Sequence, residues 1–249
     1  MLIKNKVIVT HFVYLIRCEE KGKLLCMAVI ELKGINKTYK KGNEEVKALI
    51  DINFTFEKGK FYAIMGHSGS GKSTLISILG LMNKFDSGEY LLNGKSVRDL
   101  SDMEASKIRM KEIGFVFQEF YLDEYMTALD NVILPMLINK EINKQDREKK
   151  AEVLLKKFNL VERKNHLPKE LSGGEKQRIC IARALANNPS IILADEPTGD
   201  LDEENEKMIF DYLKELSKEG KCVIVVSHSN EVKNYADVLI DLKNGKLVK

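Results

Sequence analysis

The chain has 249 residues, 44% of them hydrophobic, a length that suits one large domain or two small ones with a substantial core. Its 40 basic and 37 acidic residues leave a formal net charge of +3, so charge is abundant but nearly balanced. That balance argues against a general nucleic-acid-binding protein, which would concentrate basic residues on one face, and we expect no nucleic-acid partner.

Two further features of the composition limit the function classes. The four cysteines have no paired metal-ligand spacing, and Cys180 and Cys222 lie in apolar runs, as core residues of a protein in a reducing compartment do. No apolar run approaches the roughly 20 residues that span a bilayer. We therefore expect that any membrane crossing belongs to another chain.

The first 26 residues differ from the rest of the chain. Lys4 and Lys6 precede an apolar run, Val7–Ile16, which superficially resembles a signal peptide. The run contains a histidine, and Cys18–Lys21 offers no small-residue cleavage site, so secretion is not expected. Met27 then opens a strand-like segment. We predict that residues 1–26 are an upstream extension and that the functional domain covers residues 27–249; loss of activity on trimming to Met27 would contradict this.

Short strand-like segments alternate with turns before residue 60. Val29–Leu32 and Ala48–Phe56 flank a turn at Lys41–Asn43, and Glu89–Lys95 adds a hairpin signal through its Asn-Gly pair. This alternation predicts antiparallel hairpins in the N-terminal part of the chain.

The nine residues from Gly66 to Thr74 have the spacing of a phosphate-binding loop: glycine, four residues, glycine, lysine, and serine or threonine. The glycines let the backbone curl so that successive N–H groups face one anion, while Lys72 adds a positive charge and Ser73 can ligate Mg²⁺. We expect a bound nucleotide to contact Gly66, Ser68, Gly69, Gly71, Lys72, Ser73 and Thr74.

The flanks of this loop decide against a simple Gly/Ser linker. At average residue usage, so short a pattern arises by chance in about one chain in a hundred of this size. Here a strand-like run, Phe61–Met65, precedes the loop and a helix-like run, Thr74–Leu79, follows it. This strand–loop–helix setting is the one that phosphate binding requires.

Three apolar, strand-like runs are followed closely by polar residues. Gln118 follows Ile113–Phe117, Asp195 and Glu196 follow Ile191–Ala194, and His228 comes shortly after Cys222–Val226. Ligands of open α/β sheets collect at the carboxyl edge of the strands, so these side chains are expected at one site.

The chemistry of these side chains suggests separate roles. Two acids directly after an apolar strand are costly unless the sheet edge uses them. We expect Asp195 to hold Mg²⁺, directly or through water, and Glu196 to orient or deprotonate an attacking water. Gln118 could reach the metal or that water, and His228 could bind a γ-phosphate, although an isolated amide is more often a turn residue and a lone histidine is usually structural.

The chain becomes helical in character between Phe120 and Pro168. Ala151, Leu154, Leu155 and Phe158 recur at helical spacing, whereas the charged residues around them face elsewhere and indicate a solvated surface. The stretch Phe120–Leu137 has scattered aromatic and methionine residues that could dock a partner, although core packing is the safer interpretation for most of them.

A second glycine-containing motif, Leu171–Glu175, opens the helix predicted for Lys176–Ala186. Ser172 and Glu175 have capping-box spacing, which explains a helix start but not the adjacent Gly173 and Gly174. Such glycines let an anion approach backbone N–H groups at the positive end of the helix dipole. One nucleotide cannot easily use two helix N-termini of the same sheet, so we expect two chains to share each nucleotide.

Taken in order, the segments Gly66–Thr74, Gln118, Leu171–Glu175, Asp195–Glu196, Leu201–Asp202 and His228 closely resemble the ATP-binding-cassette family of ATPases. The resemblance covers roughly residues 27–249. It implies an α/β fold: a phosphate-loop NTPase core with a mostly parallel sheet, an N-terminal antiparallel β subdomain and an inserted α-helical subdomain at about residues 120–185. It also implies an ATP-dependent homodimer in which Ser172, Gly173 and Gly174 of one copy cover the nucleotide of the other. By the same resemblance, Tyr39 stacks on adenine, whereas the residues alone favour an ordinary strand tyrosine.

The motifs resemble most closely the free-standing cassettes of the macrolide-export, lipoprotein-release and antimicrobial-peptide-resistance subfamily. Gly114–Gln118, Leu129–Val132 and Ala194–Gly199 carry that likeness. Two residues depart from the common pattern: Glu175 stands where many members have glutamine, and Asp200 where alanine or asparagine is more usual.

The resemblance implies a subunit at the cytoplasmic face of the membrane that hydrolyses MgATP and drives a separate permease, with Glu196, His228, Lys72 and Gln118 as the catalytic set and Ser73, Gln118 and Asp195 at the metal. An alternative is a cassette that acts mechanically on a cell-envelope or division complex without transport. A soluble cassette of DNA repair or translation is disfavoured because the chain has neither a long coiled-coil insertion nor two cassettes. A kinase is disfavoured because it would leave the second glycine motif without a role.

Overall fold

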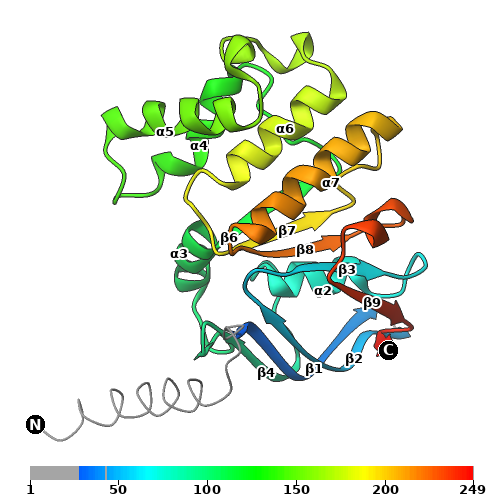
Figure 1. The fold of residues 1–249 in the computed structure, drawn as a ribbon. Helices are drawn as coiled ribbons and strands as arrows, with labels where there is room; N and C mark the ends of the chain where they lie inside the picture. The colour runs from blue at the N-terminus through cyan, green and yellow to red at the C-terminus, as the bar shows by residue number, and fades with distance from the viewer. Residues whose placement is uncertain (1–27, 43, 249) are drawn as a thin grey trace, which may run out of the picture.

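The computed structural model describes residues 28–42 and 44–248. The predicted extension at residues 1–26 therefore lies outside the described residues, as does Asn43 of the predicted turn. The described chain forms two β-sheets with helices packed around them (Figure 1). Among the residues that the structure describes, no helix combines the length and the apolar character that crossing a bilayer requires.

The two sheets differ in strand direction. The four-stranded sheet, in the order β2-β1-β4-β5, is antiparallel and contains β1 (Ala28–Lys41), β2 (Glu44–Glu57), β4 (Ser87–Leu92) and β5 (Lys95–Ser96). The six-stranded sheet, in the order β10-β9-β3-β8-β7-β6, contains β3 (Phe61–Met65), β6 (Ile113–Phe117), β7 (Ile191–Asp195), β8 (Cys222–Val226), β9 (Val238–Lys243) and β10 (Lys246–Val248). Its pairs are parallel except for β9 with β10. The predicted mostly parallel core and antiparallel N-terminal region are confirmed.

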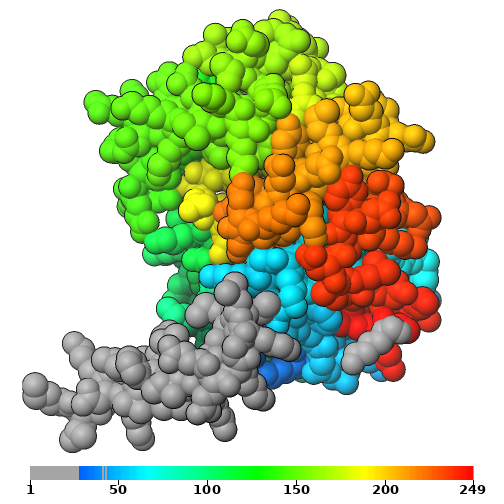
Figure 2. Space-filling model, viewed as in Figure 1, coloured from blue at the N-terminus to red at the C-terminus, as the bar shows by residue number. Residues whose placement is uncertain are grey.

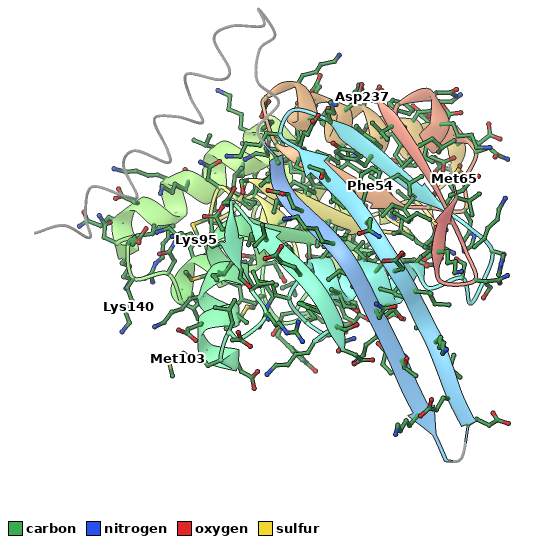
Figure 3. All side chains as sticks on the ribbon, turned by 90° about the horizontal axis from the view of Figure 1, so that it is seen from below. Phe54, Met65, Lys95, Met103, Lys140 and Asp237 are labelled. Atoms are coloured by element: carbon green, nitrogen blue, oxygen red, sulfur yellow. The ribbon has the colours of Figure 1, made fainter. Side chains whose placement is uncertain are left out.

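The N-terminal region has one long hairpin before the phosphate loop, where the sequence indicated several short ones. β1 and β2 form one long hairpin, which extends beyond the body of the molecule in Figure 3. A second, two-residue hairpin joins β4 to β5 at Asn93 and Gly94, whose φ angles of 48° and 73° are those of the turn that an Asn-Gly pair favours.

Strands β3, β7 and β8 of the six-stranded sheet are buried on both faces, which explains their continuous apolar runs. Alternate residues of a strand point to opposite faces. In β3, Phe61 and Ala63 pack with the helices on one side, whereas Tyr62 and Ile64 pack with helix α2 (Lys72–Leu79) and the four-stranded sheet on the other. Helix α2 is thus held between the two sheets.

The other helices in residues 28–42 and 44–248 are α3 (Asp102–Glu112), α4 (Ala128–Leu137), α5 (Lys144–Lys157), α6 (Gly173–Ala184) and α7 (Glu203–Lys218), with three short 3₁₀ helices at Val161–Arg163, Pro168–Glu170 and Glu231–Asn234. α4, α5 and α6 form the green and yellow-green lobe at the top of Figures 1 and 2. Within the segment predicted to be helical, residues 120–127 lack helix. The face predicted for α5 and its end is buried at Ala151, Leu155 and Phe158 and partly buried at Leu154.

Candidate nucleotide site

The polar residues predicted at the strand ends meet at one edge of the six-stranded sheet. Phe117 of β6 pairs with Asp195 of β7, and Asp195 pairs with Val226 of β8. The chain leaves all three strands at the same level, so Gln118 and Glu196 emerge side by side. His228, two residues beyond β8, lies at the same edge, and its backbone N–H donates to Oε2 of Glu196 at 3.0 Å.

The phosphate loop turns directly from β3 into α2, and two of its glycines are required by close backbone contacts. A Cβ on Gly71 would lie 2.4 Å from the carbonyl oxygen of Ala48, and Gly71 has a φ of 107°. A Cβ on Gly66 would lie 2.2 Å from the carbonyl oxygen of Leu242. Neither position can hold a side chain without displacing the backbone of another strand or turn.

The N-terminus of α2 is open to an anion. Gly71 is its N-cap, no side chain caps it, and its first turn contains no acidic residue. The unpaired N–H groups and the positive end of the helix dipole are therefore available to a ligand.

Lys72 begins this helix and is only 7% exposed. Its Nζ donates to the carbonyl oxygens of Gly66 at 2.8 Å and His67 at 3.1 Å, so the side chain folds back along the loop. Burial lowers the pKa of Lys72, while the charges of Glu196 and Asp195 oppose this change. The two carboxylates thus stabilise the charged amine beside the cradle.

These features surround an open cavity of about 790 Å³, a volume within the usual range for small-molecule sites. It is lined by eleven of the predicted site residues: Tyr39, Ser68, Gly69, Gly71, Lys72, Ser73, Thr74, Gln118, Asp195, Glu196 and His228. Gly66 does not line it, because it supports the loop against Leu242 instead.

The cavity wall also contains residues outside the predicted site set: Val46, Lys47, Ala48, Phe117, Glu119, Tyr121, Gly199 and Val226. Val46 pairs directly with Tyr39 across the β1–β2 hairpin, and Lys47 pairs with its neighbour Thr38. The hairpin register would have found Val46, since directly paired residues share a face, whereas it places Lys47 on the face of Thr38. Tyr39 is 39% exposed, so part of its ring is accessible from the cavity.

Glu196 is held in an unusual conformation at the centre of the site. Its φ is 47°, in the left-handed region, and its N–H donates to the carbonyl oxygen of Val226 at 2.9 Å. Nε2 of His228 lies 3.3 Å from Oε1 of Glu196, a buried oxygen to which the described residues donate no hydrogen bond. Such backbone strain concentrates at functional sites, where the surrounding structure maintains it.

Asp195 and its neighbours supply a set of hard oxygen donors. Burial raises the pKa of Asp195, the charge of Glu196 adds to this, and the positive charge of Lys72 opposes it. The Ser73 hydroxyl and the Gln118 amide line the same cavity. Carboxylate, hydroxyl and amide oxygens are the ligands that Mg²⁺ accepts, so the residues present fit that metal.

Gln118 is held from the side by the loop after β7. Its Nε2 donates to Oδ1 of Asp200 at 3.4 Å, and a Cβ on Gly199 would come within 3.0 Å of its side chain. Asp200 is one of the two residues that depart from the common motif. With its Nε2 directed to Asp200, the amide keeps its oxygen for other partners.

The second glycine motif lies elsewhere. Ser172 is the N-cap of α6, and Gly173 and Gly174 are its first two residues, as predicted. None of the three lines the cavity. The capping box is complete: Ser172 Oγ accepts from the N–H of Glu175, and the Glu175 side chain accepts from the N–H of Ser172.

Side chains of helix α6 also donate hydrogen bonds to the two loops that contain the candidate catalytic residues Gln118 and Glu196. The fully buried Gln177 donates through Nε2 to the carbonyl oxygens of Phe117 at 3.1 Å and Pro197 at 2.7 Å. Arg183 donates through Nη2 to the carbonyl oxygen of Phe120 at 2.7 Å and through Nη1 to that of Tyr121. Helix α6 is therefore connected by hydrogen bonds to the segments around Gln118 and Glu196.

Comparison with known proteins agrees with this geometry. The family model described as ABC transporter matches residues 49–199, which is more than half of the chain. The chain belongs to the ABC transporter ATPase family. The cassette is 47% identical over 223 residues to an uncharacterized ABC transporter ATP-binding protein of Methanocaldococcus jannaschii, MJ0796, with 88% of this chain and 95% of that protein covered.

Other relatives of the cassette are longer. It is 49% identical over 217 residues to the macrolide export ATP-binding/permease protein MacB of Bdellovibrio bacteriovorus, with 87% of this chain covered. The cassette spans only 33% of that relative's length.

Solved structures share the fold of the cassette. A dimeric, post-hydrolysis structure of MJ0796 with ADP and Pi has a TM-score of 0.81 at 44% identity, covering 88% of this chain and 97% of that one. The cbiO1 protein of Clostridium perfringens, part of a cbiONQ transporter complex, has a TM-score of 0.80 at 28% identity, covering 89% and 87%.

Proposed function

We propose that this ABC ATPase is a subunit that drives a separate membrane permease from the cytoplasmic side, and that it works as an ATP-dependent homodimer. The observation that carries the proposal is the incomplete cavity. It holds a phosphate loop and a candidate base, yet the second phosphate-type motif, Ser172–Gly174, lies outside it on the same chain. A second copy placed head to tail would supply that motif.

Each part of the site has an assigned role in this proposal. The Gly66–Thr74 loop and Lys72 bind the terminal phosphates, and Tyr39 stacks on the base. Glu196 accepts a proton from the attacking water, since it is the carboxylate next to the metal-type ligands and is fixed by His228. Lys72 and His228 stabilise charge on the transferred phosphoryl group.

The metal site is part of the proposal. Ser73, Asp195 and Gln118 would hold Mg²⁺, which when bound neutralises phosphate charge. Burial and the charge of Glu196 disfavour the charged form of Asp195, and a bound cation would oppose both effects. Gln118 is held by Asp200, and its loop accepts a hydrogen bond from α6. A movement of Gln118 on nucleotide binding would therefore be transmitted to the surface at residues 118–126, where we propose that the permease docks.

The direct test is Glu196→Gln in the full-length chain. We expect ATP binding to persist, phosphate release to fall by about 10²–10⁴-fold, and a stable dimer to form with ATP but not without it. Light scattering after size exclusion measures the dimer. Glu215→Gln, an exposed carboxylate of α7, is the matched control and should behave as the parent. Hydrolysis by Glu196→Gln at the parental rate would refute the assigned base.

The transported substrate is proposed from the resemblance of the motifs to one subfamily: antimicrobial peptides, macrolides or lipoproteins. The Bdellovibrio relative is named a macrolide export protein, which supports macrolides. Cross-linking the Glu196→Gln cassette in native membranes and identifying the captured membrane protein tests the permease. Capture of a cell-wall or division complex without a permease would replace transport with a mechanical role.

A further inference from the structure

The hydroxyl of Ser172 already donates its one proton within its own capping box. Its Oγ donates to Oε2 of Glu175 at 2.9 Å and accepts from the N–H of Glu175 at 3.3 Å. The N–H of Ser172 donates to the same carboxylate oxygen at 2.8 Å. A phosphate that approaches this end of α6 must therefore compete with Glu175 for the hydroxyl proton.

Glu175 competes with a full charge. Partial burial acts to raise its pKa, but the hydrogen bonds from Ser172 and Arg163 lower the pKa of Glu175 to about 2. Its side chain is 17% exposed, so water screens the charge only in part. A fixed negative charge in the first turn of α6 offsets the positive helix end that would otherwise attract an anion.

Arg163 neutralises the other oxygen of this carboxylate. Its Nε lies 2.7 Å from Oε1 of Glu175, whereas Oε2 faces Ser172. Arg163 ends the 3₁₀ helix Val161–Arg163, and its backbone is fixed on both sides, by an N–H bond to Leu160 at 3.0 Å and by the N–H of His166 at 2.9 Å. The guanidinium thus approaches from a rigid turn and leaves the Ser172 side of the carboxylate open.

We propose that Arg163 is a positioning residue that weakens Glu175 as a competitor, so that Ser172 and the backbone of Gly173 and Gly174 can bind the nucleotide phosphate held by a second copy. This rests on the proposed dimer. The carboxylate shares its negative charge with Arg163, which makes Oε2 a poorer acceptor and reduces repulsion of the phosphate. Without Arg163, the same capping box would hold Ser172 more firmly and repel the anion.

The proposal predicts that Arg163 matters only while Glu175 is charged. The test is a double-mutant cycle in the Glu196→Gln background, with Arg163→Met, Glu175→Gln and the combined variant. We expect Arg163→Met to raise the ATP concentration for half-maximal dimerisation about 5–10-fold when Glu175 is present. When residue 175 is glutamine, the same change should alter it by less than about twofold.

Two controls separate charge from structure. Arg163→Lys keeps the charge and should restore most of the dimerisation lost in Arg163→Met, and Arg163→Gln replaces Arg163→Met if the latter unfolds in a thermal melt. Equal losses with and without Glu175 would overturn the proposal, because Arg163 would then act only through the fold. A Glu196→Gln protein that forms no dimer with ATP would refute the proposed dimer, and the role of Arg163 with it.

Discussion

Two helices of this chain begin with glycines that are suited to phosphate, yet their first turns differ in every other respect. Helix α2 starts at Lys72 behind a glycine cap, with no capping side chain and no acidic residue. Helix α6 starts behind Ser172 with a complete capping box and the charged Glu175. The first is left open to an anion, and the second is closed by its own side chains.

This difference suggests separate roles for the two helix ends: the open end of α2 binds phosphate directly, whereas the capped end of α6 binds it only after a change in its hydrogen bonds. An open, positively charged helix end can hold phosphate in a single chain, whereas a capped end must exchange hydrogen bonds before it binds. Only α2 lines the cavity with Asp195 and Glu196. We infer that α2 determines the affinity for nucleotide. We also infer that α6, through its hydrogen bonds to the loops around Gln118 and Glu196, determines whether a second copy binds.

The largest expected effect comes from removing the charge that distinguishes α2. Lys72→Ala should reduce phosphate release by about 10²–10³-fold, because no other residue of the loop supplies a positive charge to the phosphates. A coupled phosphate-release assay measures this. Lys140→Ala, whose side chain points away from the body of the molecule in Figure 3, is the control and should stay within about twofold of the parent. A Lys72→Ala protein that keeps more than a tenth of the parental rate would contradict the claim that phosphate binding at α2 depends on this charge.

A smaller effect distinguishes the two glycines of α6. A Cβ on Gly174 would lie 2.0 Å from Oδ1 of Asn205, whose amide also bonds Asp202, whereas a Cβ on Gly173 meets Leu201 at an ordinary 3.4 Å. Gly174→Ala should therefore lower the free energy of unfolding by about 1–3 kcal/mol. Gly173→Ala should leave it unchanged or raise it by up to about 1 kcal/mol, since alanine favours helix.

Both alanine variants should nevertheless impair ATP-dependent dimerisation in the Glu196→Gln background. Urea unfolding and light scattering, measured on the same samples, separate the two properties. If Gly173→Ala dimerised as readily as the parent, the exposed start of α6 would have no part in covering a nucleotide.

The smallest effect concerns pH. The pKa of Glu175 is lowered to about 2 from an ordinary value of 4.5, so the unfolded chain binds a proton at this residue before the folded chain does. Its contribution to stability is present above about pH 4.5 and is lost as the pH falls towards 2. Glu175→Gln should be less stable than the parent at neutral pH, and the gap should close on acidification. A gap in urea unfolding that is constant from pH 6 to about pH 3 would show that the carboxylate charge contributes nothing.

Much of the fold followed from local patterns in the sequence. The apolar runs that became β7 and β8 are continuous because both faces are buried, and an Asn-Gly pair marked the hairpin at Asn93. Helix α3 had no such signal. None of its residues is buried, so its sequence lacks an apolar period, and only the Ser101–Glu104 capping box marks its start.

The site was predictable where one motif carries its own chemistry and not where contacts depend on tertiary packing. The positions of the loop around Lys72 and of the acids after β7 could be predicted, because polar residues that follow apolar parallel strands meet at one edge of the sheet. Other contacts join segments that are far apart in the sequence, and no local pattern predicts that these segments lie close together. They are the hydrogen bonds from Gln177 and Arg183 to backbone carbonyl groups and the ion pair between Arg163 and Glu175.

The pairing of β3 has a consequence for how the protein is made. β3 and its loop are synthesised early, but its partners are β8 and β9, and Phe61 pairs with Val223. The loop is also braced by the N–H of Gly245, which donates to Ser70 at 3.0 Å. On the ribosome, the apolar β3 must wait for most of the chain before it can pair, which is slow and exposes it to aggregation. The first functional motif to be translated is thus among the last to become ordered.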